Sequence, residues 1–325
     1  MTVIGVSLFM KHCHGFSSRN TVAAKYSRFA TASSLEATST SSGKGKLLVL
    51  GGTGFLGQCI CRRALLEGYQ VTSVSRRGIP PPEKSGGDTI STATASSSSQ
   101  PLSGSNYIDY RRGDARQPDT VTKILQEGGY IGVVHCIGLL FDDASGLGAY
   151  NRLVSGSGSI PDENSSYDSI TRVSAFNAID AAIEYAKSQQ SSANDSKRRL
   201  PFVFTSAAEA GWPDVAGGPQ IEQFLAPDWL RRYLAAKRAV EERLTSKDTT
   251  LSLRPVIVRP SLIYSLDRPA SYLPVGAFFV GNRLGLPFVD RPVTVQSLAN
   301  AVVRSLSREE VEGVLRYPDI DALNQ

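Results

Sequence analysis

Three glycines with the spacing G-x-x-G-x-x-G lie where an apolar run passes into an apolar-periodic stretch (LLVLGGTGFLGQCI, residues 47–60). In a strand–turn–helix, Gly51 would make the tight turn, Gly54 would let the backbone approach a pyrophosphate, and Gly57 would allow the helix to pack closely on the strand. The helix N-terminus, with Phe55 and Leu56, would direct N–H groups and a partial positive charge at the phosphates. The spacing therefore predicts a dinucleotide site; the alternative is a turn that only shapes the fold.

The end of the second expected strand indicates which dinucleotide would bind. An enzyme that uses NAD carries a carboxylate there for the ribose hydroxyls, whereas this chain has Ser75, Arg76 and Arg77. Two guanidinium groups could hold a 2′-phosphate, so NADP(H) is favoured over NAD(H); a solvated arginine pair on a loop is the alternative. Asp114, which follows the third expected strand, could meet an adenine edge or cap a helix.

These residues require a framework that positions them, and the hydrophobic pattern provides one from Lys46 onward. Apolar runs predict strands, and apolar residues at helical spacing predict the helices between them. The expected strands are 47–50, 71–75, 107–110, 131–137, 202–205 and 253–258, and the expected helices are 55–67, 121–126, 167–187 and 229–244. This alternation predicts an α/β Rossmann-type fold, a doubly wound parallel sheet with helices on both faces.

The N-terminal part and one insertion differ from this framework. Residues 1–45 contain one acid, Glu36, against five basic residues, and they are rich in Ser, Thr and Ala. This composition is typical of an organellar transit peptide, mitochondrial rather than plastid, and an ordinary disordered tail is the alternative. Residues 80–105 are rich in Pro, Gly and Ser, so they are predicted to be a disordered insertion within the domain 46–325.

Composition and cysteine spacing argue against several other classes of protein. The net charge is +5 and the basic residues are spread out without interleaved aromatic residues, which disfavours nucleic-acid binding. The four cysteines are irregularly spaced, and Cys59 and Cys61 would point to different faces of one helix, so neither a disulfide framework nor a metal site is predicted. No apolar run reaches the ~18 residues that a membrane-spanning helix needs.

The order of short motifs along residues 46–325 resembles the extended and atypical short-chain dehydrogenase/reductase superfamily. The motifs that carry the resemblance are GGTGFLG (51–57), RRGD (111–114), VVHCIG (133–138), YDSITRVSAFNAIDAA (167–182), FVFTSA (202–207), YLAAK (233–237) and LRPVIVRPSLIY (253–264). The longer pieces HCIGLLFDD, TSAAEAGWP and YLAAKRAVEE are similar to a mitochondrial branch related to the nucleotide-binding accessory subunit of respiratory complex I. Within that branch, the chain is most similar to fungal accessory proteins of coenzyme Q synthesis.

The resemblance implies an NADP(H)-binding protein in the mitochondrial matrix, or on the matrix face of the inner membrane, that belongs to an assembly. The function it favours is support of coenzyme Q (ubiquinone) biosynthesis, with components of the coenzyme Q biosynthesis complex or of complex I as partners. Two alternatives stay open. One is a non-catalytic accessory subunit or assembly factor of complex I, and the other is an organellar NADPH-dependent reductase or isomerase of another small molecule.

Within the superfamily, a Tyr-x-x-x-Lys pair transfers a proton beside the nicotinamide, the lysine lowers the pKa of the tyrosine, and a serine orients the substrate carbonyl. Tyr233 and Lys237 match the pair, and their spacing places both side chains on one face of a helix. The position of the superfamily's serine aligns with Ser206 in one register and with Ala207 in a register shifted by one residue. Thr171 stands where the superfamily usually has an asparagine, so the resemblance leaves open whether the chain is an active oxidoreductase.

The last part of the chain, about residues 262–325, is expected to supply cap elements over the substrate. Its segment SYLPVGAFFVGNRLGLPFV (271–289) is rich in apolar and aromatic residues. Such a cap would suit a prenylated quinone or a peripheral contact with the membrane, and ordinary core packing is the alternative. His135 lies inside an apolar strand and is expected to be a core histidine rather than a catalytic one.

Overall fold

The computed structural model describes residues 43–81, 107–151, 161, 163–190, 198–266, 272–286 and 289–325. The predicted transit peptide, except for its last three residues, lies outside these ranges, as does nearly all of the predicted insertion 80–105. The first strand begins at Lys46, where the hydrophobic pattern places the start of the domain.

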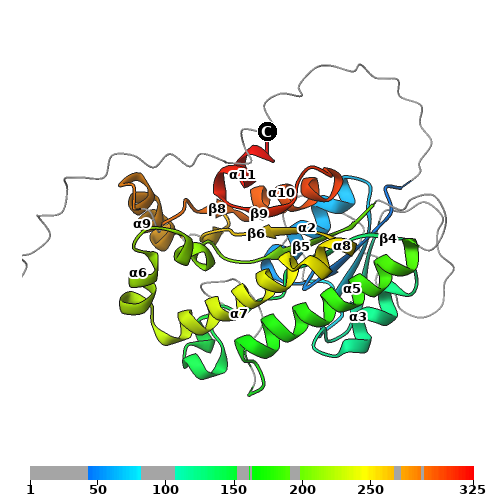
Figure 1. Cartoon of the computed structure of the whole chain (residues 1–325), viewed down its shortest axis with the longest axis horizontal. Coiled ribbons are helices and arrows are strands. Elements are labelled where there is room, and N and C mark those ends of the chain that lie inside the picture. Colours follow the sequence, from blue (N-terminus) through cyan, green and yellow to red (C-terminus); the bar gives the residue numbers. More distant parts are fainter. Residues whose placement is uncertain are drawn as a thin grey trace, which may run out of the picture. The chain divides into compact units, whose positions relative to one another are not determined.

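The centre of the fold is a seven-stranded sheet in which neighbouring strands run parallel (Figure 1). The strands are β1 (Lys46–Leu50), β2 (Gln70–Ser75), β3 (Ile108–Arg112), β4 (Tyr130–His135), β5 (Leu200–Thr205), β6 (Leu253–Val258) and β9 (Gly313–Leu315). Their order across the sheet is β3-β2-β1-β4-β5-β6-β9, so the chain proceeds outward from β1 and then, in the opposite direction, from β4. The carboxyl ends of β1 and β4 therefore flank a topological switch point, where open α/β sheets bind their ligands.

Helices cover both faces of this sheet (Figure 1). On one face α2 (Phe55–Leu66) packs with α10 (Val295–Ser307), and on the other lie α3 (Pro118–Leu125), α5 (Ser174–Gln190), α7 (Asp228–Thr245) and α8 (Lys247–Ser252). Every residue of Leu47–Leu50 and of Leu253–Val258 is buried, because each strand has helices on both of its faces. The predicted Rossmann-type, doubly wound parallel sheet is thus confirmed.

The C-terminal segment divides between this sheet and a smaller part beside it. β9 is the seventh strand, α10 lies on α2, and α11 (Tyr317–Ala322) follows β9. By contrast, β7 (Ile263–Tyr264) and β8 (Val293–Thr294) form a separate two-stranded sheet, and α9 (Tyr272–Arg283) lies between them in the chain. This smaller part and α6 (Gly218–Leu225) line a cavity at the carboxyl ends of the strands. Within the expected cap region, the lining of that cavity comes from this part.

The helix predicted over residues 167–187 begins irregularly. Asp168–Val173 form a π-helical stretch, and regular α-helix starts at Ser174. The Ser174 hydroxyl lies 3.0 Å from His135 Nε2 and donates to the carbonyl oxygen of Ile170. Thr171, at the position of the superfamily's asparagine, is fully buried within this stretch. Such stretches are frequent near functional sites, and here Ile170 and Ser174 both line a cavity.

Candidate functional site: two cavities at the switch point

The glycine turn has the geometry that dinucleotide binding requires. Gly51 has a φ of +87°, a conformation that favours glycine, and its N–H donates to the Val74 carbonyl oxygen at 2.9 Å. A Cβ on Gly57 would lie 2.2 Å from the Gly51 carbonyl oxygen, so only glycine lets α2 approach the turn this closely. Gly54 is the N-cap of α2, and no side chain caps that helix end. The N-terminus of α2 therefore presents backbone and a partial positive charge to a ligand.

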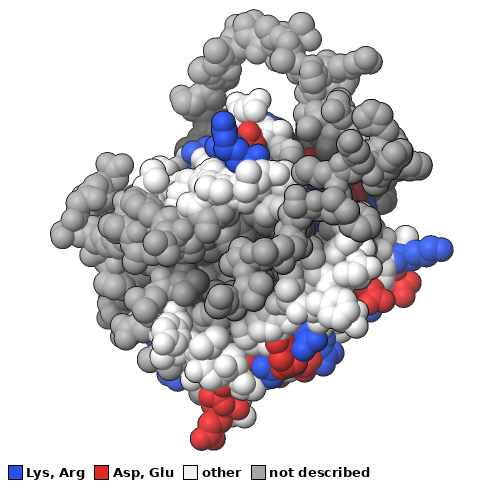
Figure 2. Space-filling view, turned by 90° about the vertical axis from the view of Figure 1, so that its left-hand side faces the viewer, with Lys and Arg blue, Asp and Glu red and all other residues white. Residues whose placement is uncertain are grey.

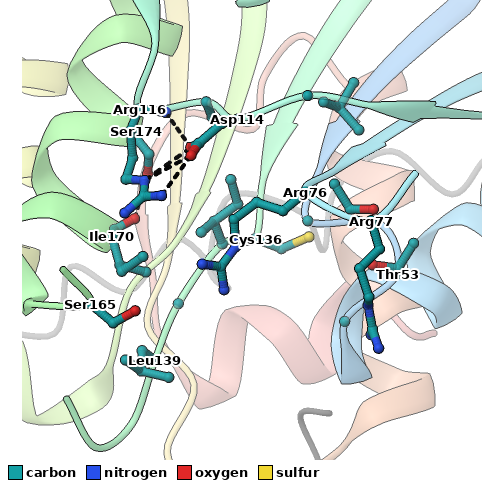
Figure 3. A pocket seen from close by; sticks show the side chains of 18 of the residues that line it. Thr53, Arg76, Arg77, Asp114, Arg116, Cys136, Leu139, Ser165, Ile170 and Ser174 are labelled. Atoms are coloured by element: carbon teal, nitrogen blue, oxygen red, sulfur yellow. Dashed lines mark hydrogen bonds and ion pairs between the residues drawn. The ribbon is translucent and has the colours of Figure 1, made fainter. Parts of the chain in front are cut away.

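A first cavity of about 370 Å³ opens at this turn (Figure 3). It brings together five of the predicted cofactor residues, which are Gly51, Gly54, Arg76, Arg77 and Asp114. Gly57 packs beneath the turn and does not line the cavity, and Phe55 and Leu56 line a second cavity instead. The shape and the residues fit the adenosine diphosphate half of a dinucleotide.

Asp114 is already paired with a residue that the sequence reasoning missed. Its carboxylate accepts hydrogen bonds from the backbone N–H of Arg116 at 3.0 Å and from the Arg116 guanidinium at 2.6 Å (Figure 3). These bonds, and more weakly the charge of Arg76, hold the pKa of Asp114 below its usual value. The residue that caps the following helix is Gln117, so Asp114 is not the N-cap. The Asp-x-Arg spacing in the sequence could have indicated this pair.

The end of β2 carries arginines and no acid. Arg76 and Arg77 are exposed, and Figure 3 shows their side chains extending along the cavity from the end of that strand. The Ser75 hydroxyl accepts a hydrogen bond from the Gly78 N–H at 3.1 Å, which shapes the turn that presents the two arginines. An anionic group bound here would meet guanidinium groups rather than a carboxylate.

A second cavity of about 540 Å³ lies on the other side of residues 136–139, at the carboxyl ends of β5 and β6. Gly54, Cys136, Ile137, Gly138 and Leu139 line both cavities. A dinucleotide could therefore extend from the first cavity, across the glycine turn, and place its nicotinamide half in the second. The second cavity is mostly apolar, with aromatic walls from Trp212, Trp229 and Phe278.

Tyr233 and Lys237 both line this second cavity, on one face of α7 as predicted. Lys237 Nζ donates to the Thr205 carbonyl oxygen at 2.7 Å and lies 5.6 Å from the centre of the Tyr233 ring. Burial lowers the pKa of Lys237 to about 8. Burial and the nearby Glu209 carboxyl raise the pKa of Tyr233, which is the opposite of the lowering that the resemblance implies. Tyr233 is therefore held as a neutral phenol that can donate a hydrogen bond.

Ser206 also faces this cavity, next to Ala207, the alternative position for the serine. Its side chain is 4% exposed, and its hydroxyl has no hydrogen-bond partner among the described residues. The hydroxyls of Thr205 and Ser261, which line the same cavity, are likewise without partners in the described part of the chain. Because a buried hydroxyl without a partner is costly, these three groups fit a ligand that supplies oxygen atoms.

Glu209 is a further residue of the cavity that the sequence reasoning did not single out. Burial raises the pKa of its carboxyl to about 7, so the group is part neutral and part charged near neutral pH. Its position in FTSAAEAG, just after β5, could have indicated a site residue, because polar residues that follow parallel strands meet at one edge of the sheet.

His135 is fully buried at the end of β4 and contributes to neither cavity wall, as expected of a core histidine. Among the described residues there is no group of three or more His, Cys, Asp or Glu side chains that could hold a metal ion. Within the same residues, no helix has the length and hydrophobicity needed to cross a membrane.

The switch point, the glycine turn and the two adjoining cavities define a Rossmann-type α/β protein with a candidate dinucleotide site. Residues 47–149 match the NAD dependent epimerase/dehydratase family. This match confirms the resemblance to short-chain-dehydrogenase-like proteins that the motifs predicted.

Similar proteins include MIOREX complex component 2 of Saccharomyces cerevisiae, which is 25% identical over 307 residues, spanning 85% of this chain and 98% of that protein. A similar solved structure is the Bordetella bronchiseptica enzyme WbmF in complex with NAD+, with a TM-score of 0.48 and 16% identity over 84% of this chain and 73% of that chain. Another is the UDP-glucose 4-epimerase of Thermus thermophilus in complex with NAD, with a TM-score of 0.47 and 18% identity over 83% of this chain and 76% of that chain.

Proposed function

We propose that the chain is a mitochondrial NADP(H)-binding, reductase-like protein that supports coenzyme Q (ubiquinone) biosynthesis. The observation that carries the proposal is the pairing of the two cavities across residues 136–139. One cavity has the glycine turn and the arginines that suit a phosphorylated dinucleotide. The other has apolar walls with Tyr233, Lys237 and Ser206, which suit an apolar compound that carries a carbonyl group.

The preference for NADP(H) rests on the end of β2. Arg76 and Arg77 lie at the cavity that suits the adenosine half, and the position after the strand offers no carboxylate for a ribose diol. In the proposed complex Arg76 and Arg77 hold the 2′-phosphate, and the Asp114–Arg116 pair lies against the adenine. The N-terminus of α2 receives the pyrophosphate.

The apolar cavity supports a prenylated quinone or a related precursor as its ligand. Trp212, Trp229 and Phe278 would pack on a quinone ring or a prenyl chain, and the unpartnered hydroxyls would meet ring oxygens. Exposed apolar side chains, Phe224 and Leu225 of α6 and Val280 of α9, extend from the helices that line the cavity. On the face that Figure 2 shows, the described Lys, Arg, Asp and Glu side chains lie mainly along the lower border and in a small group near the top. This arrangement supports a peripheral contact with the inner membrane, from which such a ligand would enter.

The mitochondrial placement is supported by the composition of residues 1–45 and by the motif resemblance. The yeast relative is named as a component of a complex, which is consistent with a chain that acts within an assembly. We place the protein in the matrix or on the matrix face of the inner membrane, with components of the coenzyme Q biosynthesis complex as its partners.

A non-catalytic accessory role in complex I is the second candidate. Two observations favour it: Thr171 replaces the superfamily's asparagine, and the pKa of Tyr233 is raised rather than lowered. In that role the dinucleotide would only stabilise the fold, since a ligand at 100 times its dissociation constant adds ~2.7 kcal/mol to the folded state.

Deletion of the gene distinguishes the two candidates. Quinone and its prenylated precursors are measured by mass spectrometry, and the level of complex I is measured in the same mitochondria. A fall in quinone with intact complex I supports the proposal. Normal quinone with depleted complex I supports the accessory role, and no change in either points to an NADPH-dependent reductase or isomerase of another small molecule.

A further inference from the structure

The apolar cavity contains two ionisable groups of opposite sign besides Tyr233 and the Cys136 thiol. Among the described residues that line it, Glu209 is the one acid and Lys237 is the one base. Lys237 donates to the Thr205 carbonyl oxygen, whereas the partner of the Glu209 carboxyl among the described residues is its own backbone N–H. A carboxyl group in an apolar cavity, with no side chain of opposite charge bonded to it, is costly unless it has a function there.

Glu209 is held in place through its backbone. Arg238, which follows Lys237 on α7, donates from Nε to the Ala210 carbonyl oxygen at 2.9 Å and from Nη2 to the Glu209 carbonyl oxygen at 3.4 Å. The same guanidinium forms a two-pronged pair with Glu222 of α6, at 2.7 and 2.5 Å. The helix that carries Tyr233 therefore also fixes the loop that carries Glu209, and Arg238 binds the backbone of that loop rather than the Glu209 carboxyl, which lines the cavity.

We propose that Glu209 is a proton-relay residue of the reductase, which returns a proton to Tyr233 after Tyr233 has given its own to the substrate. This inference rests on the proposed function, because it assumes that NADPH reduces a carbonyl compound in this cavity. Glu209 acts through the Tyr233 hydroxyl, directly or through one water molecule, and is not itself required to touch the substrate.

The relay balances for a quinone. NADPH, when bound, would supply two electrons and one hydrogen as a hydride. The Tyr233 hydroxyl would give the second hydrogen, as a proton, to a quinone carbonyl oxygen. Glu209 then protonates the Tyr233 phenolate and takes up a proton from water at the cavity mouth. The sum is quinone, NADPH and one proton converted to hydroquinone and NADP+.

The electrostatics of the cavity favour this direction. Burial raises the pKa of both Tyr233 and Glu209, and the Glu209 charge adds to the effect at Tyr233, so Tyr233 is protonated in the resting site and its phenolate would readily take a proton from Glu209. Titratable and charged groups near Glu209 come from several elements. Tyr233 and Lys237 of α7 line the same cavity, and Arg238 of α7, which is paired with Glu222 of α6, binds the Glu209 carbonyl oxygen. The charged group that shifts the pKa of Glu209 is Asp290, before β8, which is itself paired with Arg316. The Asp290 charge acts in the same sense as burial and raises the pKa of Glu209.

Tryptophan fluorescence gives a test that needs neither substrate nor cofactor. The chain has two tryptophans, Trp212 and Trp229, and both line the cavity. We expect their fluorescence to change with pH in a transition near 7, and Glu209→Gln to remove that transition. The matched control, Glu242→Gln, alters an exposed acid on the same helix as Tyr233 and should leave the transition in place. A second transition near 8, from Lys237, should persist in both variants.

The kinetic test uses a short-chain 1,4-benzoquinone with NADPH. In the wild type, kcat should fall as pH rises through 7, because the relay needs the protonated carboxyl. Glu209→Gln should lower kcat at pH 6.5 by about 10²-fold with little change in KM and flatten the profile, while Glu209→Asp should restore part of the rate. If Glu209→Gln keeps the wild-type kcat and pH profile while the wild type reduces the quinone, the relay is wrong and the reductase function stands. If the folded wild type does not oxidise NADPH with this quinone, the reductase function assumed here fails and the relay with it.

Discussion

Gly57 of α2 lies so near Gly51 of the turn that a Cβ on Gly57 would be 2.2 Å from the Gly51 carbonyl oxygen. The same Cβ would lie 2.7 Å from the Cα of Gly52, so it would meet backbone that has no rotamer to change. The third glycine of the motif therefore sets how far α2 can advance toward the turn, and with it the position of the helix end that faces the phosphates.

Gly57→Ala is expected to lower the free energy of unfolding by about 2–3 kcal/mol, because α2 must move away from the turn. It should also weaken NADPH binding at least tenfold at a temperature where the variant is folded. The matched control is Gly276→Ala in α9, where an added Cβ meets no atom within 4 Å. Thermal unfolding with and without NADPH measures both effects. An unchanged NADPH-induced shift in Gly57→Ala would show that the cofactor does not use this turn.

Arg76→Ala and Arg77→Ala should each weaken NADPH binding about tenfold and leave NADH binding nearly unchanged, because each removes a charge-assisted contact to the 2′-phosphate. Ser75→Asp should shift the preference toward NADH by placing a carboxylate at the ribose. Arg62→Ala, an exposed arginine of α2 outside both cavities, is the control. Titration calorimetry measures the affinity of each variant for the two cofactors. Equal losses of affinity for NADPH and NADH would mean that the arginines bind the pyrophosphate instead.

The sheet and the position of the glycine turn could be predicted from the sequence, for a physical reason. The strands Leu47–Leu50 and Leu253–Val258 are continuous apolar runs because both faces of the sheet are covered, and the glycine spacing is local. The surroundings of Glu209 could not be predicted from the sequence in this way. Its raised pKa depends on burial by segments distant in the chain, such as those of Trp229 and Phe278, and hydrophobic periodicity does not say which segments meet.

The sequence pattern did not predict the π-helical stretch before α5 or the raised pKa of Tyr233, for similar reasons. Periodicity predicts one helix from residue 167, but Asp168–Val173 are π-helical, and the Ser174 hydroxyl that follows them contacts His135 of β4. Tyr-x-x-x-Lys spacing does place both side chains on one face of α7, yet it carries no information on what else that face meets. Here it meets Glu209 and Tyr167, both of which raise the pKa of Tyr233.

His135 predicts how stability depends on pH. Burial, with help from the Lys237 charge, lowers its pKa from 6.5 to about 3, so the folded protein holds it neutral while the unfolded chain protonates it below about 6.5. The stabilising contribution is therefore present above pH 6.5 and is lost as pH falls toward 3. Between pH 7 and 5 the wild type should lose about 2 kcal/mol relative to His135→Gln, measured by urea unfolding at both values. A constant difference between the two proteins would show that the fold does not lower the pKa of His135.

Ser206 should show opposite effects on stability and on activity. Its buried hydroxyl has no partner among the described residues, so Ser206→Ala should raise the free energy of unfolding by about 1 kcal/mol. If that hydroxyl holds the substrate carbonyl, the same variant should reduce a short-chain quinone about 10²-fold more slowly. The control is Ser305→Ala, since Ser305 is equally buried but donates to the Val302 carbonyl oxygen at 2.7 Å, and its loss should cost about 1 kcal/mol with no kinetic effect. Urea unfolding and NADPH oxidation measure the two quantities, and full activity in the stabilised Ser206→Ala would leave the carbonyl to Tyr233 alone.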